Sequence, residues 1–240
     1  MESELVRKLK KEILEMQGIK PMTHNRSVET GLGPVHHAFP YGVFPIGIHE
    51  FVSQEPEEAA ATTGFMAGLI SKLVRNDGTC LWIGNRRKIF PPGLNYFGVN
   101  PERIIFVEAV RNADLVWMLE QALRCEALGL VIGEMADMDP GQARRLQLTV
   151  EQCRVSCFLH RYRPRIASAS YAVCRWRVKP LPGHTEEGLP GVGFPAWEVS
   201  LDKVRNGYPG SWKLQWVEDH FEFEQTAERK TGKSALLHIA

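Results

Sequence analysis

The chain has 240 residues and a formal net charge of +1 at pH 7, so its charge argues neither for nor against a nucleic-acid partner, and any basic surface must be local. With 44% hydrophobic and 24% charged residues, the composition excludes disorder of the whole chain. The length allows one sizeable domain or two small ones. No apolar run approaches the ~20 residues needed to cross a bilayer, so we expect a soluble cytoplasmic protein without membrane contact.

Residues 1–20 carry apolar side chains at helical spacing opposite a Lys- and Glu-rich face, which predicts an amphipathic helix. Such a helix either lies on the domain surface or binds a partner, and both interpretations stay open. Residues 21–47 are irregular and rich in Gly, Pro and His. His36 and His37 are adjacent, but no further ligand-type residue follows at metal spacing, so we expect no metal site.

From residue 48 onward, strand patterns and helix patterns alternate. Apolar strands are predicted at 48–52, 79–84, 103–109, 128–133 and 155–160, and helices at 56–74, 112–127 and 140–153. This alternation predicts an α/β fold, with a mainly parallel sheet that carries helices on both faces.

Three further stretches alternate apolar and polar residues, at 168–178, 196–204 and 210–224. They predict antiparallel strands at one edge of the sheet. The last residues are mostly polar. We therefore expect a core domain at 21–220, preceded by the helix at 1–20 and followed by a flexible tail at 221–240.

The five cysteines include no CxxC pair, and most of them lie in apolar runs. Such residues are usually buried free thiols, so we expect neither a metal-binding nor a redox role for them. They are Cys80, Cys125, Cys153, Cys157 and Cys174.

The turn between the strand at 48–52 and the helix at 56–74 occupies the place where a phosphate-binding loop, GxxxxGK[ST], normally lies. It carries Glu55, Glu57 and Glu58, with no glycine and no lysine. Phosphate binding needs closely approaching backbone N–H groups and a lysine, whereas like charges at ~4 Å repel by several kcal/mol in a partly buried site. The same glutamates suit a helix start, because they meet the positive end of the helix dipole. A helix-start role and a partner-docking role both stay open.

The order of these elements resembles the RecA core. The stretches FPIGIHEFV, AAATTGFMAGLISKL, PPGLNYFGV, ADLVWMLEQALRCEALGLVIGE and RRLQLTVEQC are similar to the ImuA family, the RecA-like accessory proteins of bacterial SOS mutagenic translesion synthesis. The resemblance spans roughly residues 35–217. SulA, the cell-division inhibitor of the same SOS response, is a more distant relative. The alternative function is therefore an inhibitor that binds the tubulin-like division protein.

The resemblance places three functional positions of RecA on this chain. The phosphate-loop lysine falls near Ala59 to Ala61, and the glutamate that activates water falls near Arg86, which stays protonated and cannot act as a base. The acidic residue that steers magnesium falls at Glu134, the one position of the three that keeps a carboxylate. We therefore expect a degenerate phosphate loop, no nucleotide cofactor and no ATPase activity. The degenerate loop comprises Gln54, Glu55, Glu57, Glu58 and Ala59.

The best basic cluster lies between residues 161 and 179, where arginines alternate with aromatic residues. In RecA the DNA-binding loops lie in this part of the fold, so the resemblance implies a surface for single-stranded DNA. The alternative is a solvated sheet edge whose charges prevent aggregation. The DNA-binding candidates are Arg161, Arg163, Arg165, Arg175, Trp176, Arg177 and Lys179.

Partners are implied only by the resemblance. The resemblance implies that an ImuB-type inactive homologue of Y-family polymerases is the direct partner. It implies that a DnaE-type error-prone polymerase is contacted through this partner, and it also implies contact with RecA. Lys203 and Arg205 lie in a predicted hairpin and are candidates for contact with a neighbouring subunit. The tail adds Arg229, Lys230 and Lys233. The sequence thus favours a non-catalytic accessory protein of SOS-induced error-prone DNA repair.

Overall fold

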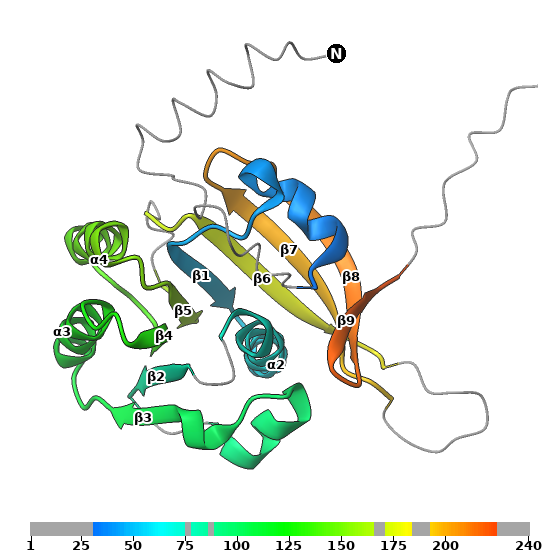
Figure 1. Cartoon of the computed structure of the whole chain (residues 1–240), viewed down its shortest axis with the longest axis horizontal. Helices are drawn as coiled ribbons and strands as arrows, with labels where there is room; N and C mark the ends of the chain where they lie inside the picture. Colours follow the sequence, from blue (N-terminus) through cyan, green and yellow to red (C-terminus); the bar gives the residue numbers. More distant parts are fainter. Residues whose placement is uncertain (1–30, 75–77, 86–88, 166–170, 184–192, 225–240) are drawn as a thin grey trace, which may run out of the picture.

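The structure is a computed structural model that describes residues 31–74, 78–85, 89–165, 171–183 and 193–224 (Figure 1). Within these residues, nine strands form one sheet in the order β3-β2-β4-β5-β1-β6-β7-β8-β9. The strands are β1 (Ile48–Ser53), β2 (Thr79–Gly84), β3 (Ile104–Glu108), β4 (Leu128–Met135), β5 (Cys157–Tyr162), β6 (Cys174–Leu181), β7 (Ala196–Val204), β8 (Gly210–Val217) and β9 (His220–Phe223). The helices are α2 (Pro56–Leu73), α3 (Asn112–Leu123) and α4 (Pro140–Cys153), with short 3₁₀ turns η1 (Gly33–Ala38), η2 (Pro40–Gly42), η3 (Pro91–Phe97) and η4 (Pro101–Arg103).

The sheet changes character at β6. All pairs from β3 to β6 are parallel, including the pair between β1 and β6. The pairs from β6 through β7 and β8 to β9 are antiparallel. We call β3, β2, β4, β5 and β1 the parallel half, and β6 to β9 the antiparallel half. The predicted α/β class, with a mainly parallel sheet and antiparallel strands at one edge, is confirmed.

Local sequence signals account for the helix limits. Helix α4 begins and ends where the pattern predicts, because Asp139 accepts a hydrogen bond from the backbone N–H of Gly141 in a capping box that Gln142 completes. It ends at Arg154, which has a left-handed backbone conformation (φ 59°). Helix α3 ends at Leu123, four residues before its predicted end at 127, in a turn closed by the N–H of Cys125 on the carbonyl of Ala122.

The sheet has a core on each face. On one face, α2 and η1 cover the large side chains of β1, β6, β7 and β8, among them Phe51, Trp176 and Trp216, all fully buried. On the opposite face, α3 and α4 cover β1, β2, β4 and β5 through residues such as Val131 and Leu146 (Figure 1). Because side chains alternate along a strand, neighbouring residues of β1 enter different environments.

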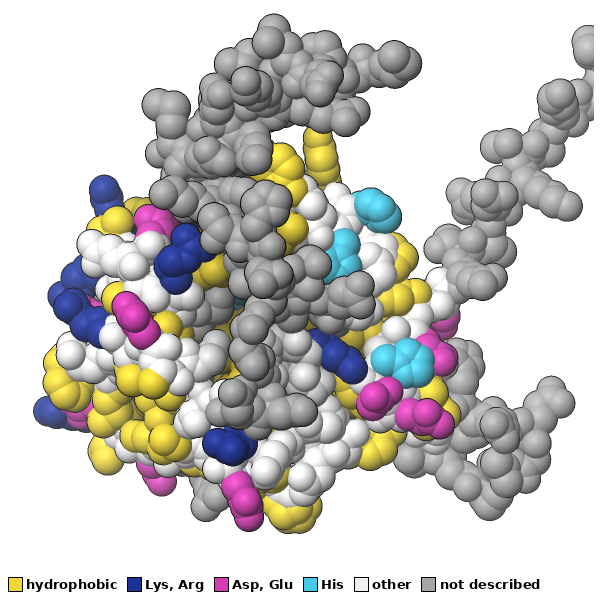
Figure 2. All heavy atoms as spheres, in the orientation of Figure 1, with side chains coloured by type: hydrophobic (Ala, Val, Ile, Leu, Met, Phe, Trp, Pro, Cys, Tyr) yellow, Lys and Arg dark blue, Asp and Glu magenta, His cyan; other side chains and the backbone are white. Residues whose placement is uncertain are grey.

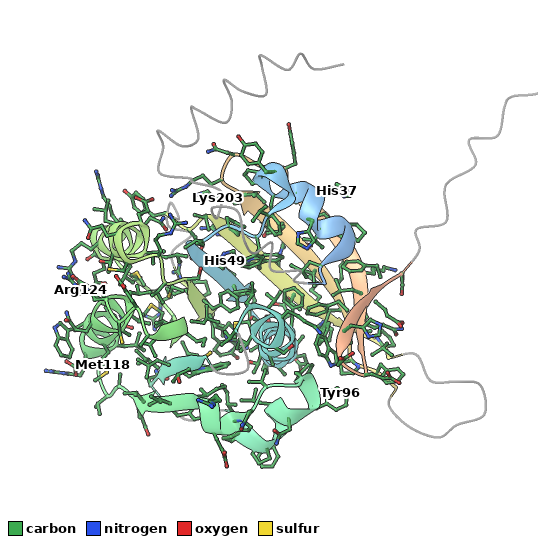
Figure 3. The ribbon with its side chains drawn as sticks, in the orientation of Figure 1. His37, His49, Tyr96, Met118, Arg124 and Lys203 are labelled. Atoms are coloured by element: carbon green, nitrogen blue, oxygen red, sulfur yellow. The ribbon has the colours of Figure 1, made fainter. Side chains whose placement is uncertain are left out.

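His49 is buried in the α2-side core, between the ring of Phe44 and β6 (Figure 3). Its Nε2 lies 2.8 Å from the carbonyl oxygen of Pro45, and its Nδ1 accepts a hydrogen bond from Nε1 of Trp176 at 3.2 Å. These two partners fix the neutral tautomer with the proton on Nε2. Burial lowers the pKa of His49 from 6.5 to about 4, against the smaller opposing effect of the Pro45 carbonyl.

The antiparallel half is covered on one face only. Its α2-side face is buried, whereas the opposite face carries polar and charged side chains such as Arg177, Lys179, Ser211 and Lys213, all exposed. The core under α3 and α4 includes none of the described residues of β6 to β9, so no described helix packs on this open face (Figure 1).

The predicted domain limits need one correction. Strand β9 extends to Phe223, and Phe221 is buried against Trp216, so the predicted tail boundary at 221 cuts through a strand of the core. The predicted helix at 1–20 and the remainder of the tail lie outside the described residues. No helix in the described part of the chain is long and apolar enough to cross a membrane.

Candidate functional site

The elbow between β1 and α2 takes the form of a helix start. Pro56 is the first helical residue, and Glu55 precedes it in extended conformation. The backbone N–H of Gln54 donates to Glu58 Oε2 at 2.8 Å. Arg163, which follows β5, donates from Nε to the Gln54 carbonyl at 2.8 Å and from Nη2 to Glu55 Oε2 at 3.2 Å. The chain's own side chains thus hold the turn, and Glu57 remains exposed in the first turn of the helix.

Beneath the elbow, buried hydroxyl and imidazole groups join the strand ends. Ser53 Oγ lies 2.9 Å from Thr62 Oγ1 and 3.0 Å from Nε2 of His160. A serine beside a histidine suggests a nucleophile and its base. Ser53 and Thr62 are completely buried, however, so no substrate reaches the hydroxyl in this conformation. The cluster therefore serves to fix α2 to β1 and β5.

Glu134 lies beside His160 at the ends of β4 and β5, where the two strands pair. Its Oε1 accepts a hydrogen bond from Nε1 of Trp82 at 3.1 Å. The carboxylate predicted at the magnesium-steering position is therefore tied to a tryptophan of β2. Arg86, the predicted lost base position, lies outside the described residues. Among those residues no group of three potential metal ligands is found.

A cavity of about 1040 Å³ opens beside the elbow at the carboxyl ends of the parallel strands. Its walls come from the small residues of one side of α2, from the η3 segment, and from the ends of β6 and β7. Glu134 and His160 lie on its floor. No sequence pattern identified this cavity, because its lining comes from segments far apart in the chain. Its main wall residues are Ala59, Ala60, Gly64, Leu94, Phe97, Pro180, Leu181, Phe194 and Trp197.

Two predicted DNA-binding residues, Arg161 and Trp176, are buried, so their assignment is wrong. Arg161 has a side chain only 5% exposed and donates from Nη1 to Glu50 Oε1 at 2.7 Å and from Nη2 to Asp137 Oδ1 at 3.2 Å. Arg175 donates from Nε to Glu50 Oε2 at 2.8 Å, so two arginines share one buried carboxylate. Trp176 is fully buried and stacks on Phe51, which leaves no face for a base. Arg161 and Trp176 belong to the core because helices cover their side of the sheet.

The other basic candidates do reach the surface. Arg175, Arg177 and Lys179 alternate with buried residues and share one face of β6. Arg177 pairs with Asp202 at 2.8 Å. Arg163 has a left-handed backbone (φ 48°), so the extended geometry that would align it with Arg165 is not present.

The two hairpin candidates lie at the same end of the open face. Lys203 of β7 lies opposite Arg175 of β6 in the strand register (Figure 3). Burial is the main cause that lowers the pKa of Lys203, and the nearby charges of Arg175 and Arg205 lower it further. Arg205 donates to Glu151 at 3.1 Å and to the carbonyl of Tyr171 at 2.9 Å. Arg205 thus joins β7 to α4 within the subunit. Arg229, Lys230 and Lys233 lie outside the described residues.

Lys and Arg side chains also gather over α3 and α4, a surface that the sequence patterns did not single out (Figure 2). Several of them are paired: Arg124 and Arg145 both contact Glu120, at 3.2 and 3.5 Å. Arg111 is paired with Asp114 at 2.7 Å. Three arginines of this surface thus contact two carboxylates.

Three of the cysteines are unreactive by burial. Burial raises the pKa of Cys80 and of Cys157 to about 12, and it raises the pKa of Cys174 further. Such thiols remain protonated near neutral pH and are poor nucleophiles. Cys125 is exposed, and all five are free.

No family model matches the chain. Protein ImuA of Caulobacter vibrioides, present in two strains, is 35% identical to it over 190 residues, which cover 74% of this chain and 78% of the relative. Among solved structures, SulA from Pseudomonas aeruginosa is similar with a TM-score of 0.41 and 18% identity, over 49% of this chain and 99% of SulA. By its identity to ImuA over three quarters of its length, this chain belongs to the ImuA family.

Proposed function

We propose that this chain is a non-catalytic accessory protein of SOS-induced translesion synthesis, which acts through contacts with other proteins. Membership of the ImuA family supports the role in error-prone DNA repair. The observation that carries the non-catalytic part is the elbow, where a helix start with three glutamates occupies the place of a phosphate loop.

The electrostatics of the elbow oppose a triphosphate. Of its three carboxylates, Glu55 is balanced by Arg163, whereas Glu57 is exposed at the helix start. A phosphate group at the elbow would meet this negative charge. No lysine of the helix would neutralise it, because Ala59 lies near the predicted position of the phosphate-loop lysine. Glu134, already bonded to Trp82, would have no nucleotide-bound magnesium to steer.

A thermal-shift measurement with ATP and Mg²⁺ tests this part. A nucleotide present at 100 times its Kd would stabilise the fold by ~2.7 kcal/mol and raise Tm by about 5–10 °C for a chain of this size. We expect no change beyond about 1 °C, which is well below that rise. A rise of several degrees that disappears in Ala60→Trp, which places an indole ring in the cavity beside the elbow, would contradict the proposal.

For the partners, we propose an ImuB-type polymerase homologue as the direct contact, with a DnaE-type polymerase reached through it and RecA as a further contact. The tail residues Arg229, Lys230 and Lys233 are the first candidates. Deletion should begin at residue 225 rather than 221, because Phe221 and Phe223 belong to β9. We expect this deletion to lower recovery of the ImuB-type partner in a pull-down at least tenfold. Undiminished recovery would move the contact to the core.

Single-stranded DNA is a second proposed ligand, for which the open face of the antiparallel half is the surface. Arg177 and Lys179 are exposed there on one face of β6. We expect the double reversal Arg177→Glu and Lys179→Glu to weaken binding of an oligothymidylate. It should also reduce the slope of log K against log salt by about 0.7 for each phosphate that the variant no longer neutralises.

The matched control reverses Arg103 and Arg144, two exposed arginines outside β6. If only the control variant loses binding, single-stranded DNA binds outside β6. If the wild type and both variants bind DNA equally, the charges of this sheet edge serve to prevent aggregation instead.

A further inference from the structure

We propose that the C-terminal segment of this same chain, residues 225–240, docks with its apolar end in the cavity at the strand ends. The proposal needs only the cavity, the place where the described chain ends, and the sequence that follows. It does not depend on the proposed function. Nothing in the role of an accessory protein requires such a contact.

The cavity is built for an apolar occupant. Along α2 the lining residues are small, with Ala60 exposed and Gly64 half-buried, so the helix surface is open to another chain. Phe90 and Phe194 stand in the lining with 73% and 38% of their surface exposed. An occupant that covered these rings would remove apolar surface from water.

Two acidic side chains in the described part of the lining favour a basic occupant. Of the described lining residues, Glu57 and Glu134 are acidic, and none is Lys or Arg. Glu57 is exposed at the elbow, where Glu55 and Glu58 add further carboxylates. An incoming segment is therefore favoured if basic side chains meet this rim while apolar side chains enter the cavity.

The tail has that order of residues. Arg229, Lys230 and Lys233 come first, and the chain then ends in the apolar run Ala-Leu-Leu-His-Ile-Ala from residue 235 to 240. The basic part precedes the apolar part by a few residues. One continuous segment can thus place basic side chains near the elbow and apolar side chains in the cavity.

The described chain ends within reach of the cavity. Phe221 of β9 contacts Trp197, a wall residue of the cavity, with ring centroids 6.3 Å apart. The Glu224 N–H donates to the carbonyl of Lys213, which pairs with Glu198 of β7, so Glu224 lies two strand spacings, about 10 Å, from β7. Sixteen extended residues span up to about 55 Å, several times that distance.

The first test uses the core and the C-terminal segment as two separate molecules. A chain ending at Glu224 is titrated with a synthetic peptide of residues 225–240 and followed by tryptophan fluorescence and calorimetry. We expect saturable 1:1 binding that weakens at least tenfold for a peptide with Leu236→Glu and Leu237→Glu. Binding should also weaken at least tenfold when Ala60→Trp places an indole ring in the cavity, but not for Gln121→Trp on the exposed side of α3.

The peptide variant leaves the protein unchanged, so it decides the question even if Ala60→Trp fails to fold. No saturable binding at 1 mM peptide would overturn the proposal, and so would binding that neither substitution weakens.

The second test asks whether the tail docks in its own chain. A short tether gives an effective concentration near 1 mM. If the free peptide binds with a Kd near 0.1 mM, the full chain should therefore bind labelled peptide about tenfold more weakly than the truncated chain. Equal binding by both chains would overturn docking in the same chain, whether the site is then used by a second copy or by a peptide of another protein.

Discussion

In the parallel half of the sheet helices cover both faces, whereas the described elements that pack on the antiparallel half, α2, η1 and η3, lie on one face and leave the other face open. The basic stretch from residue 161 to 179 runs through both halves. Arg161 of β5 lies under a covered face and holds the carboxylate of Glu50, while Arg177 of β6 reaches the surface on the open face. The same alternation of arginine with apolar residues thus gives a structural side chain in one half and a binding candidate in the other.

The largest effect is expected from Arg161→Ala. It leaves the buried Glu50 with Arg175 as its remaining arginine, and breaking a buried ion pair costs about 3–5 kcal/mol. Urea unfolding should show this loss in the free energy of unfolding. Arg161→Lys, which keeps the charge but has fewer donors, should lose less. A loss below about 1 kcal/mol for Arg161→Ala would mean that the covered face does not make this arginine structural.

The next effect is a pH dependence from His49. Because its folded-state pKa is about 4 against 6.5 when unfolded, the unfolded chain binds more protons between these values. This contribution to stability is fully present above pH 6.5 and is lost as pH falls towards 4, by about 3 kcal/mol in total. Stability curves at pH 7, 5.5 and 4.5 measure it. His49→Gln should flatten the curve, and an unchanged slope would show that other groups cause it.

The packed face of the antiparallel half can be tested with Gly68→Ala. A Cβ at Gly68 would meet Phe221 at 2.7 Å and Trp216 at 2.9 Å. The better helix propensity of alanine gains up to ~1 kcal/mol, but overpacking costs about 1–3 kcal/mol, so we expect a net loss of about 1 kcal/mol. Gly64→Ala, with 3.2 Å to Phe97, serves as the control and should stay closer to the wild type. Stabilisation by Gly68→Ala would indicate a looser contact between α2 and β9.

The smallest effect is expected on the open face. Arg177 and Asp202 form an ion pair at 2.8 Å with both side chains about half exposed, and such pairs contribute about 0–1 kcal/mol. A double-mutant cycle with Arg177→Ala and Asp202→Ala should give a coupling energy in this range. A coupling energy as large as that of a buried ion pair would show that the open face does not weaken ion pairs relative to the covered face.

The sequence was sufficient where a signal is local. The helix predicted at 140–153 is confirmed at both ends, and the residues that form its start, Asp139, Pro140 and Gln142, are close neighbours in the sequence. The continuous apolar runs of β2 and β4 marked strands buried on both faces. Arg175, Arg177 and Lys179 lie on one side of β6, because side chains alternate along a strand.

Periodicity does not tell which side of a strand will be covered. Trp176 and Arg161 were assigned to a DNA surface because aromatic and basic residues alternate there, yet packing by α2 and α4 places both in the interior. The cavity and the pair of arginines on Glu50 join residues more than 100 positions apart. Only the order of strands in the sheet brings such residues together.

The ion cluster of Glu50 has a consequence for synthesis. The ribosome makes Glu50 before either of its cationic partners, which lie 111 and 125 residues further along. Until both have emerged, burial of β1 would enclose an uncompensated negative charge. The nascent chain must therefore keep this strand hydrated through most of its translation, and a fragment that stops before β5 should not form a closed core.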